Sequence, residues 1–191
     1  YADTGLAFGN SYCYFIRASN GAKTSTSNKQ CFIANVLQPP AFTYNRYATV
    51  LPDNKSITIT AHVDTTPGVY YYLLQRATGG GSFITLPPFF PKTGNAITYT
   101  DSPVSVTANT YSYRWQAMDS CAHVIMNSNS GTTMLLTASI AANLDVTLSW
   151  NDYSDSLGNT DHYDIYRAVD GIWETTPFAT LPFTGSGGTY T

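Results

Sequence analysis

Side chains suited to acid–base or metal chemistry are few in this sequence, and their spacing fits no known catalytic pattern. The histidines are His62, His123 and His162, and none is spaced with another histidine or a cysteine pair as a metal site requires. No Gly-x-Ser-x-Gly motif marks a nucleophilic serine, and the acidic residues offer no pair for glycoside hydrolysis. The sequence therefore predicts histidines that are solvated or hydrogen-bonded in turns, and a chain that is not an enzyme.

The acidic segment 151–161 is the strongest ligand candidate. Its closely spaced carboxylates and amides suit the oxygen shell of Ca²⁺, although the spacing fits no EF-hand. The same residue types build ordinary turns through local hydrogen bonds, so an ordinary loop is the alternative. We expect no cofactor, with Ca²⁺ as a side hypothesis. The residues that would bind it are Asp152, Asp155, Asn159 and Asp161.

Two further motifs have a structural and a functional interpretation. The run Tyr70-Tyr71-Tyr72 could offer an aromatic platform to a sugar, but alternate residues of a strand point to opposite faces, which favours packing. The run Gly79-Gly80-Gly81-Ser82 lacks the lysine and the following helix of a phosphate-binding loop. We expect it to form a turn.

The composition predicts strands and argues against several classes of partner. Aromatic residues make up 14% of the chain and charged residues only 11%, and no stretch has helical periodicity. A net charge of -3 gives no basic surface for nucleic acid. No apolar run approaches the roughly 20 residues of a membrane span, and the first residues lack a signal-peptide pattern. We expect an extracellular or cell-surface protein whose export signal lies outside this chain.

The sequence also repeats itself. Residues 72–99 recur at 163–190, an offset of 91 positions (163 minus 72). The recurring residues are Tyr72, Arg76, Gly94 and Tyr99, answered by Tyr163, Arg167, Gly185 and Tyr190. Upstream, 57–61 answers 146–150 at an offset of 89 (146 minus 57), and 12–18 answers 111–117 at an offset of 99 (111 minus 12).

Alternation within the repeated segments predicts half-buried strands. Apolar side chains occupy every second position, with Thr or Ser between them. These positions are Ile57, Ile59 and Ala61 in one copy and Val146, Leu148 and Trp150 in the other. Turn signals separate the segments, and Asn20-Gly21 predicts a hairpin with a two-residue loop.

The period fits one β-sandwich of about 100 residues. We therefore predict an all-β chain of tandem antiparallel β-sandwiches, with one complete repeat flanked by two partial ones. Residues 1–36 would hold the last strands of a preceding sandwich, 37–136 a complete sandwich, and 137–191 the first strands of a following one.

These segments resemble the fibronectin type III family of Ig-like sandwiches. Val146–Trp150 resembles its second strand, Tyr163–Arg167 its third and Gly9–Ala18 its sixth. The resemblance implies a tyrosine corner, in which the hydroxyl of a buried tyrosine bonds the nearby backbone. One departure is Ala61, where the family has tryptophan, which leaves a space for Tyr70 or Tyr72 to fill. The residues that the resemblance places in the core are Tyr12, Tyr111, Trp150, Tyr163 and Ile165.

The three cysteines are a second departure from that family. Cysteine in the sixth strand and in the Asp119-Ser120-Cys121 turn is similar to repeats of large surface proteins exported by gliding Bacteroidetes. Under the resemblance, Cys13 and Cys31 lie on neighbouring antiparallel strands, so we expect a disulfide, with two buried thiols as the alternative. Cys121 would be an unpaired thiol or the partner of a cysteine outside this chain.

These expectations favour a structural or adhesive repeat segment of a long secreted or cell-surface protein. Partial sandwiches leave strand edges and apolar faces exposed, so adjacent repeats, or neighbouring copies in a fibre, would complete them. A surface glycan or a protein could be a further ligand. The alternative is a set of non-catalytic accessory modules, or carbohydrate- or protein-binding modules, of a secreted enzyme.

Overall fold

The computed structural model describes residues 1–7, 9–34, 39–65, 68–153 and 160–191. The fold is all-β and antiparallel, as predicted, and no helix occurs in these ranges. The chain divides into two compact units, Tyr1–Gln38 and Pro39–Thr191. The division lies close to the expected boundary after residue 36. At the second expected boundary, after residue 136, the chain remains within one unit while its strands change from one set of sheets to another.

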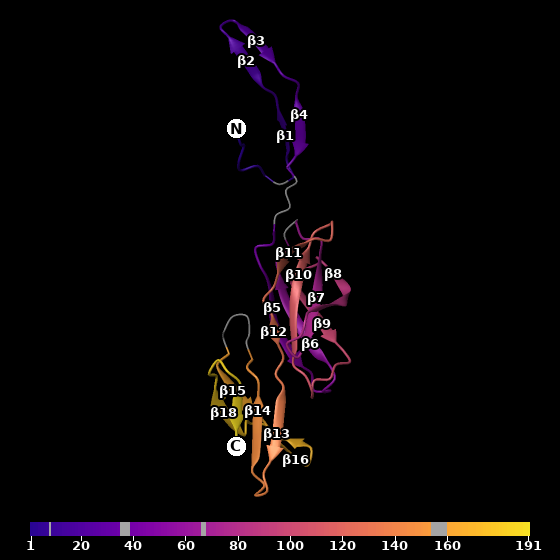
Figure 1. Ribbon diagram of the computed structural model, residues 1–191, viewed down its shortest axis with the longest axis vertical. Helices are drawn as coiled ribbons and strands as arrows, with labels where there is room; N and C mark the ends of the chain where they lie inside the picture. Colours follow the sequence, from indigo (N-terminus) through magenta and orange to yellow (C-terminus); the bar gives the residue numbers. More distant parts are fainter. Residues whose placement is uncertain (8, 35–38, 66–67, 154–159) are drawn as a thin grey trace. The chain divides into compact units, whose positions relative to one another are not determined.

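Residues 39–133 form a complete sandwich, called the central sandwich below (Figure 1). One sheet has three strands in the order β5-β6-β9, and the other has the order β11-β10-β7-β8, with β12 also pairing with β10. The bounds are β5 Thr43–Val50, β6 Ile57–Val63, β7 Tyr71–Thr78, β8 Ile84–Pro91, β9 Ala96–Asp101, β10 Tyr111–Met118, β11 Val124–Asn127 and β12 Gly131–Thr132.

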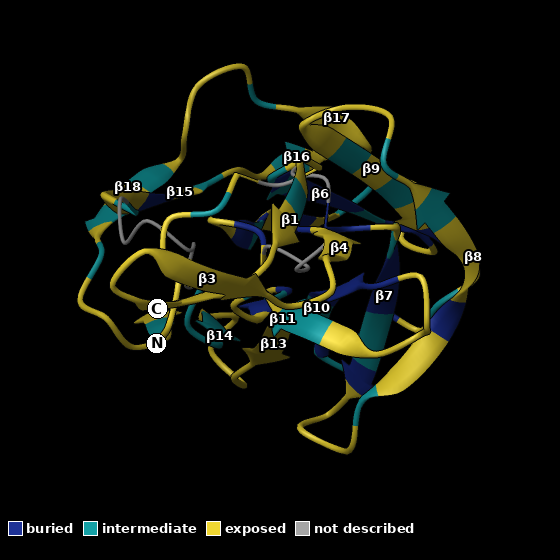
Figure 2. Cartoon of the chain, turned by 90° about the horizontal axis from the view of Figure 1, so that it is seen from above, coloured by how far each residue is buried: buried dark blue, intermediate teal, exposed yellow. Residues whose placement is uncertain are grey.

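The core of the chain lies between these two sheets. Alternate side chains of β6 and β10 are fully buried, and Figure 2 shows the buried residues gathered on β6, β7 and β10. Ala61 and Tyr72 belong to this core, whereas Tyr70 is 66% exposed, so of the two tyrosines expected near Ala61 only Tyr72 is buried. The tryptophan of this core is Trp115, which comes from β10 rather than from β6.

The first unit is a long, exposed hairpin, called the head hairpin (residues 11–33). Its two ladders pair β1 with β4 and β2 with β3. The bounds are β1 Ser11–Tyr14, β2 Arg17–Asn20, β3 Lys23–Thr26 and β4 Gln30–Ile33. The predicted hairpin with a two-residue loop forms, but Asn20 pairs with Lys23, so the loop residues are Gly21 and Ala22 rather than Asn20 and Gly21. Gly21 has φ +59°, a conformation that glycine adopts without strain. Of the sixteen strand residues, all but Tyr12 are exposed.

Residues 136–191 form a half-sandwich, called the tail half-sandwich. Its sheets have the orders β13-β14-β19, β15-β18 and β16-β17. The bounds are β13 Leu136–Ile140, β14 Val146–Trp150, β15 His162–Ile165, β16 Ala168–Val169, β17 Ile172–Trp173, β18 Ala179–Pro182 and β19 Gly188–Tyr190.

The tail half-sandwich repeats the beginning of the central sandwich. The order β13-β14-β19 corresponds to β5-β6-β9, and β15-β18 corresponds to β7-β8. The registers agree as well: Trp150 pairs with Leu136 and Gly188, as Ala61 pairs with Asn45 and Ile97. The described tail has no counterpart of β10, β11 or β12.

Burial in the tail differs from the expectation for its strands. Val146 is 44% exposed, and the other residues of β14 are only partly buried, whereas the corresponding Ile57 and Ile59 are fully buried. The alternating pattern does predict the strand and its faces. Burial of the apolar face additionally needs a counterpart of β10, which the described part of the tail lacks.

Candidate functional site

The clearest surface feature of the tail is an open apolar cleft of about 830 Å³. It lies between the β13-β14-β19 sheet and the β15-β18 sheet. Its walls include Leu148, Trp150, Tyr163, Ile165 and Phe178. In the central sandwich the corresponding space is filled by the buried side chains of β10.

Trp150 and Tyr163 contact each other in the lining of this cleft. Their rings meet edge to face with centroids 5.5 Å apart. The Tyr163 hydroxyl donates to Asp152 Oδ1 at 3.2 Å and accepts from the Tyr153 N–H at 3.3 Å. Burial, with the nearby carboxylate of Asp152, raises the pKa of Tyr163. The tyrosine is therefore kept neutral and serves as a packing element.

The outer edge of β15 is open. Within the described residues β15 pairs with β18 alone, whereas the corresponding β7 pairs with β8 on one side and β10 on the other. An unpaired edge presents backbone N–H and C=O groups that another strand can bond. After the end of β15, the Arg167 guanidinium pairs with Glu174 and lies 4.1 Å from the ring centroid of Phe178.

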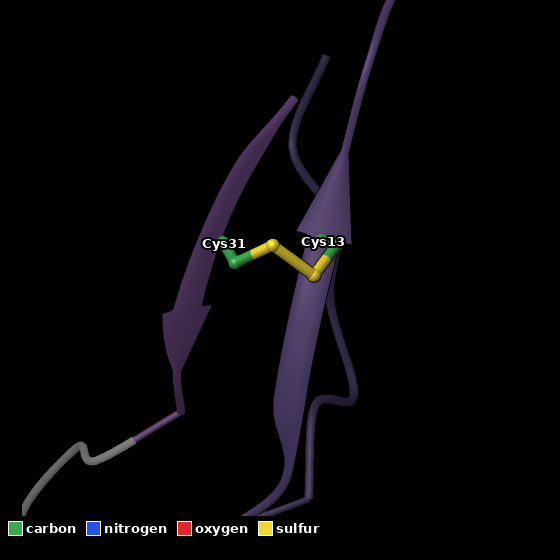
Figure 3. Close-up of a disulfide and its surroundings, with 2 residues drawn as sticks. All are labelled: Cys13 and Cys31. Atoms are coloured by element: carbon green, nitrogen blue, oxygen red, sulfur yellow. A yellow bond between two sulfur atoms is a disulfide. The ribbon is translucent and has the colours of Figure 1, made fainter. Parts of the chain in front are cut away.

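The head hairpin is held by the predicted disulfide. Cys13 on β1 lies directly opposite Cys31 on β4, and the two sulfur atoms are bonded (Figure 3). This confirms the disulfide and excludes the alternative of two buried thiols. Cys121 is exposed and unpaired, and its N–H donates to Asp119 Oδ1 at 2.8 Å.

The head hairpin shares local geometry with β10 and the strands beside it. The Tyr12 hydroxyl accepts the Ala7 N–H at 2.9 Å, and the Tyr111 hydroxyl accepts the Ser105 N–H at 3.0 Å. Both contacts are the tyrosine-to-backbone bonds that the resemblance implied. Tyr111 is buried in the core, but Tyr12 is only partly buried because no second sheet covers it within its unit.

A second shared feature is a serine that bridges the hairpin. The N–H of Ser27 donates to the Ile16 carbonyl, and the N–H of Ile16 donates to Ser27 Oγ, both at 2.8 Å. Ser128 makes the same two bonds with Trp115, also at 2.8 Å. Ile16 therefore occupies in the head hairpin the place of Trp115 in the central sandwich, as the sequence offset predicts.

The three histidines lie far apart in the sequence, and each has local partners. His62 Nδ1 lies 2.6 Å from the Tyr44 hydroxyl. His123 lies 3.3 Å from Asp119 in the same turn, and its N–H groups, with that of Cys121, lower the pKa of the Asp119 carboxyl. His162 lies 3.4 Å from Asp164. The described residues contain no cluster of histidine, cysteine and carboxylate groups that could hold a metal ion.

The candidate calcium loop is described only in part. Asp155 and Asn159 lie outside the described residues. Asp152 accepts the Tyr163 hydroxyl, and Asp161 lies 4.0 Å from His162. The calcium hypothesis stays a prediction.

The structure shows where the glycine run and the tyrosine run lie. Gly79 and Gly80 form a turn after β7, with φ of +57° and +77°, as expected. Tyr72 is buried, whereas Tyr70 and Tyr71 are in ring contact and Tyr71 lies 5.2 Å from Phe89. Phe89 and Tyr70 are about two-thirds exposed, at 68% and 66%. Part of the tyrosine run therefore contributes to an exposed aromatic surface.

The residues expected in the core are buried to different extents. Tyr111 and Tyr163 are buried, whereas Trp150 and Ile165 are partly buried at the open cleft. The sequence reasoning missed a buried polar group around Asp101, whose carboxylate accepts Arg76 at 2.8 Å and the Tyr113 hydroxyl at 2.7 Å. The recurrence of Arg76 as Arg167 was its only sequence signal.

No protein-family model matches this sequence, and no curated protein is significantly similar to it. In the described part of the chain, no helix has the length and apolar character needed to cross a membrane.

Proposed function

We propose that this chain is a structural or adhesive repeat segment of a long secreted or cell-surface protein. The observation that carries the proposal is the repetition of one architecture: the tail half-sandwich has the strand order and register of the first strands of the central sandwich. Tandem sandwiches of this kind act as stiff spacers, in which each module contacts mainly its neighbours.

An extracellular location is supported by the Cys13–Cys31 disulfide. Disulfides persist in oxidising compartments and are rare in the cytosol. The strand topology and the two tyrosine-to-backbone bonds support a relationship to the fibronectin type III family. The cysteine-bearing strands are the reason to propose that the chain belongs to a surface protein of the kind exported by gliding Bacteroidetes.

A non-catalytic role is supported by the chemistry of the polar residues. The histidine and Asp101 contacts described above are local pairs or buried structural bonds, and none combines a nucleophile with an oriented base at the cleft. The cleft itself is lined mainly by apolar side chains, which suit packing.

Immunolabelling tests this role. Antibodies raised against residues 39–133 should label the surface of intact cells of the source organism, or fibres extending from them. Labelling that requires permeabilised cells would contradict the proposal.

A second candidate function is carbohydrate binding by an accessory module of a secreted enzyme. The exposed rings of Tyr70, Tyr71 and Phe89 favour it, since such rings stack on sugar faces. A glycan array probed with the whole chain tests it. Binding that is lost in Tyr70→Ala and Phe89→Ala, and kept in the Tyr47→Ala control at another exposed tyrosine, would support this function.

A further inference from the structure

The hairpin formed by β16 and β17 occurs in both copies of the repeat. At the offset of 91, residues 169–173 correspond to residues 78–82, which connect β7 to β8. The two turns have the same backbone, because their central residues have φ of +53° and +81° in the tail and +57° and +77° in the central sandwich. One backbone therefore carries two different sets of side chains.

The side chains of the tail hairpin are not needed to form this turn. The central copy forms it almost without side chains, from Thr78-Gly79-Gly80-Gly81-Ser82. The tail copy has Ile172 and Trp173 in the last two positions, where they are 76% and 67% exposed. Grouped apolar side chains that remain in water add nothing to a core and mark an interaction site. Ile172 and Trp173 are therefore candidates for binding rather than for folding.

The exposure of these positions does not depend on further strands or modules. In the complete central sandwich, where β10 lies beside β7 and the tail follows in the same chain, residues 78–82 are all exposed. β10 pairs with this hairpin only at Thr78, on the β7 arm, whereas Ser82 belongs to the arm that leads into β8. Completion of the tail sandwich would therefore leave the position of Trp173 open to solvent.

An open depression of about 650 Å³ lies at this hairpin. Its lining combines the exposed indole with two aliphatic side chains, two carboxylates and two hydroxyl groups. Aromatic rings stack on the apolar faces of sugars, and carboxylates and hydroxyls bond sugar hydroxyls. The side chains that line it are Val169, Asp170, Ile172, Trp173, Glu174, Thr175 and Thr176.

We propose that the β16-β17 hairpin binds an uncharged glycan, with Trp173 stacking on one sugar ring and the Asp170 and Glu174 carboxylates accepting its hydroxyls. This site is separate from the exposed rings of the central sandwich. The inference deepens the adhesive part of the proposed function and rests on it, because it names the class of ligand that the segment would hold.

Charge at the hairpin favours an uncharged ligand. The only basic residue of segment 166–178 is Arg167, and its guanidinium bonds the Glu174 carboxylate. Asp170 adds a further negative charge at the turn. A site of this kind repels uronic acids, sulfated sugars and anionic lipid headgroups, and it offers acceptors to neutral sugar hydroxyls.

The size of the apolar patch favours a sugar over a protein. Stable protein–protein interfaces involve about 20–30 residues on each partner, far more than this short hairpin presents. A sugar ring needs one aromatic face and a few polar groups around it. The hairpin supplies both within a single turn and its flanking residues.

The base of the hairpin is fixed by bonds on both arms. The Glu174 N–H donates to the Arg167 carbonyl at 2.9 Å, and the Phe178 N–H donates to the Ile165 carbonyl at 2.7 Å. The Arg167 guanidinium also lies 4.1 Å from the ring centroid of Phe178. These bonds hold the arm that carries Trp173 before any ligand arrives, which lowers the ordering cost of binding.

A substitution taken from the other copy of the repeat tests the proposal. Trp173→Ser gives the tail hairpin the residue that the central hairpin has at Ser82. The full chain and this variant are applied to an array of neutral hexose oligosaccharides and of acidic ones that carry uronic acid or sulfate. We expect binding to neutral oligosaccharides and an affinity about tenfold lower in Trp173→Ser.

Hydrogen exchange separates binding from packing, because Trp173 also lines the open cleft of the tail. Protection of the β14 and β15 amides should be the same in Trp173→Ser as in the unmodified chain. Loss of that protection together with loss of binding would make Trp173 a packing residue and overturn the proposal.

Moving the indole to the central hairpin is the matched control. There, Gly79 and Phe83 stand at the positions of Asp170 and Glu174, so the carboxylates are missing. Trp173→Ser/Ser82→Trp should therefore bind no better than Trp173→Ser. Restored binding would show that any exposed indole suffices, and it would overturn the assigned site.

Three other results would overturn the proposal: no binding to any neutral oligosaccharide, equal binding by Trp173→Ser, or a preference for acidic oligosaccharides. Binding that is lost in Tyr70→Ala/Phe89→Ala and kept in Trp173→Ser would instead place the sugar on the central sandwich. If antibodies label the cell surface and no neutral glycan binds, the structural role remains without this ligand. If the glycan binds without surface labelling, the site remains without that location.

Discussion

The indole of Trp150 packs directly on the backbone of Gly188, where a Cβ atom would lie only 2.2 Å from Cζ2 of the ring. The two residues pair across β14 and β19. Glycine is thus required here by the close approach of the tryptophan, whose ring lines the open cleft.

Gly188→Ala should destabilise the tail half-sandwich by about 1–3 kcal/mol, because the methyl group forces the indole out of its place. Hydrogen exchange of the β14 and β19 amides measures the effect. Gly94→Ala is the matched control, since a Cβ there meets nothing within 4 Å. Equal protection of β14 in the two variants would contradict the role assigned to Gly188.

Removing the disulfide with Cys13→Ser and Cys31→Ser should destabilise the head hairpin by about 3 kcal/mol in the chain-entropy account. The hairpin buries little of its own surface, and isolated hairpins are marginal in water, so its strand amides should lose protection. Nuclear magnetic resonance of the full chain would detect this loss. Cys121→Ser should leave the hairpin unchanged, and retained protection in the double serine variant would refute the prediction.

Asn129→Ala should cost the central sandwich about 1–3 kcal/mol, because it leaves the N–H and C=O of Asn45 without these partners. The same change at Asn28, which lies in the other compact unit, is the matched control and should leave the stability of the central sandwich unaltered. Urea unfolding of the two variants measures the difference. An equal loss of stability in Asn28→Ala and Asn129→Ala would speak against the role assigned to Asn129.

Alkaline pH should destabilise the central sandwich through two buried tyrosines. Burial raises the pKa of Tyr72 to about 12, and burial together with the Asp101 carboxylate raises the pKa of Tyr113 further. Since the unfolded value is 10.0, the stabilising contribution is complete below pH 10 and is lost as the pH rises through the folded values.

Urea midpoints measured across this range, with tyrosinate absorbance as a second readout, check the effect. Tyr72→Phe/Tyr113→Phe should flatten the alkaline dependence. An unchanged slope in that variant would show that other groups cause the loss.

The sequence predicted strands and registers better than burial. Alternation at Ile57 and Ile59 and the constant offset to Val146 and Leu148 located two copies of one strand, because the pleat fixes which side chains share a face. The disulfide followed once the strands of Cys13 and Cys31 were taken as neighbours. Burial of β14 was overestimated, because whether an apolar face is covered depends on strands that its own sequence does not contain.

Other contacts had no local sequence signal. The bonds between Asn129 and Asn45 join residues that are 84 positions apart, and neither belongs to a recognisable motif. The tryptophan lies on β10 in the central sandwich and on β14 in the tail half-sandwich, and no local pattern in the sequence predicts this exchange. Alternation does not separate Tyr72 from Tyr70, because residues two apart in a strand share a face. Tyr70 is exposed because β7 begins only at Tyr71, and the sequence did not locate that boundary.

Cys13 alternates with Tyr12 and Tyr14, so the disulfide lies on the face of the head hairpin opposite these two rings. The link therefore holds the hairpin in shape without occupying its aromatic face, and the ordering cost of that face is met in advance. If the chain is exported as proposed, the thiol form that exists under reducing conditions would lack this constraint. The hairpin would then become ordered only after the chain reaches an oxidising compartment.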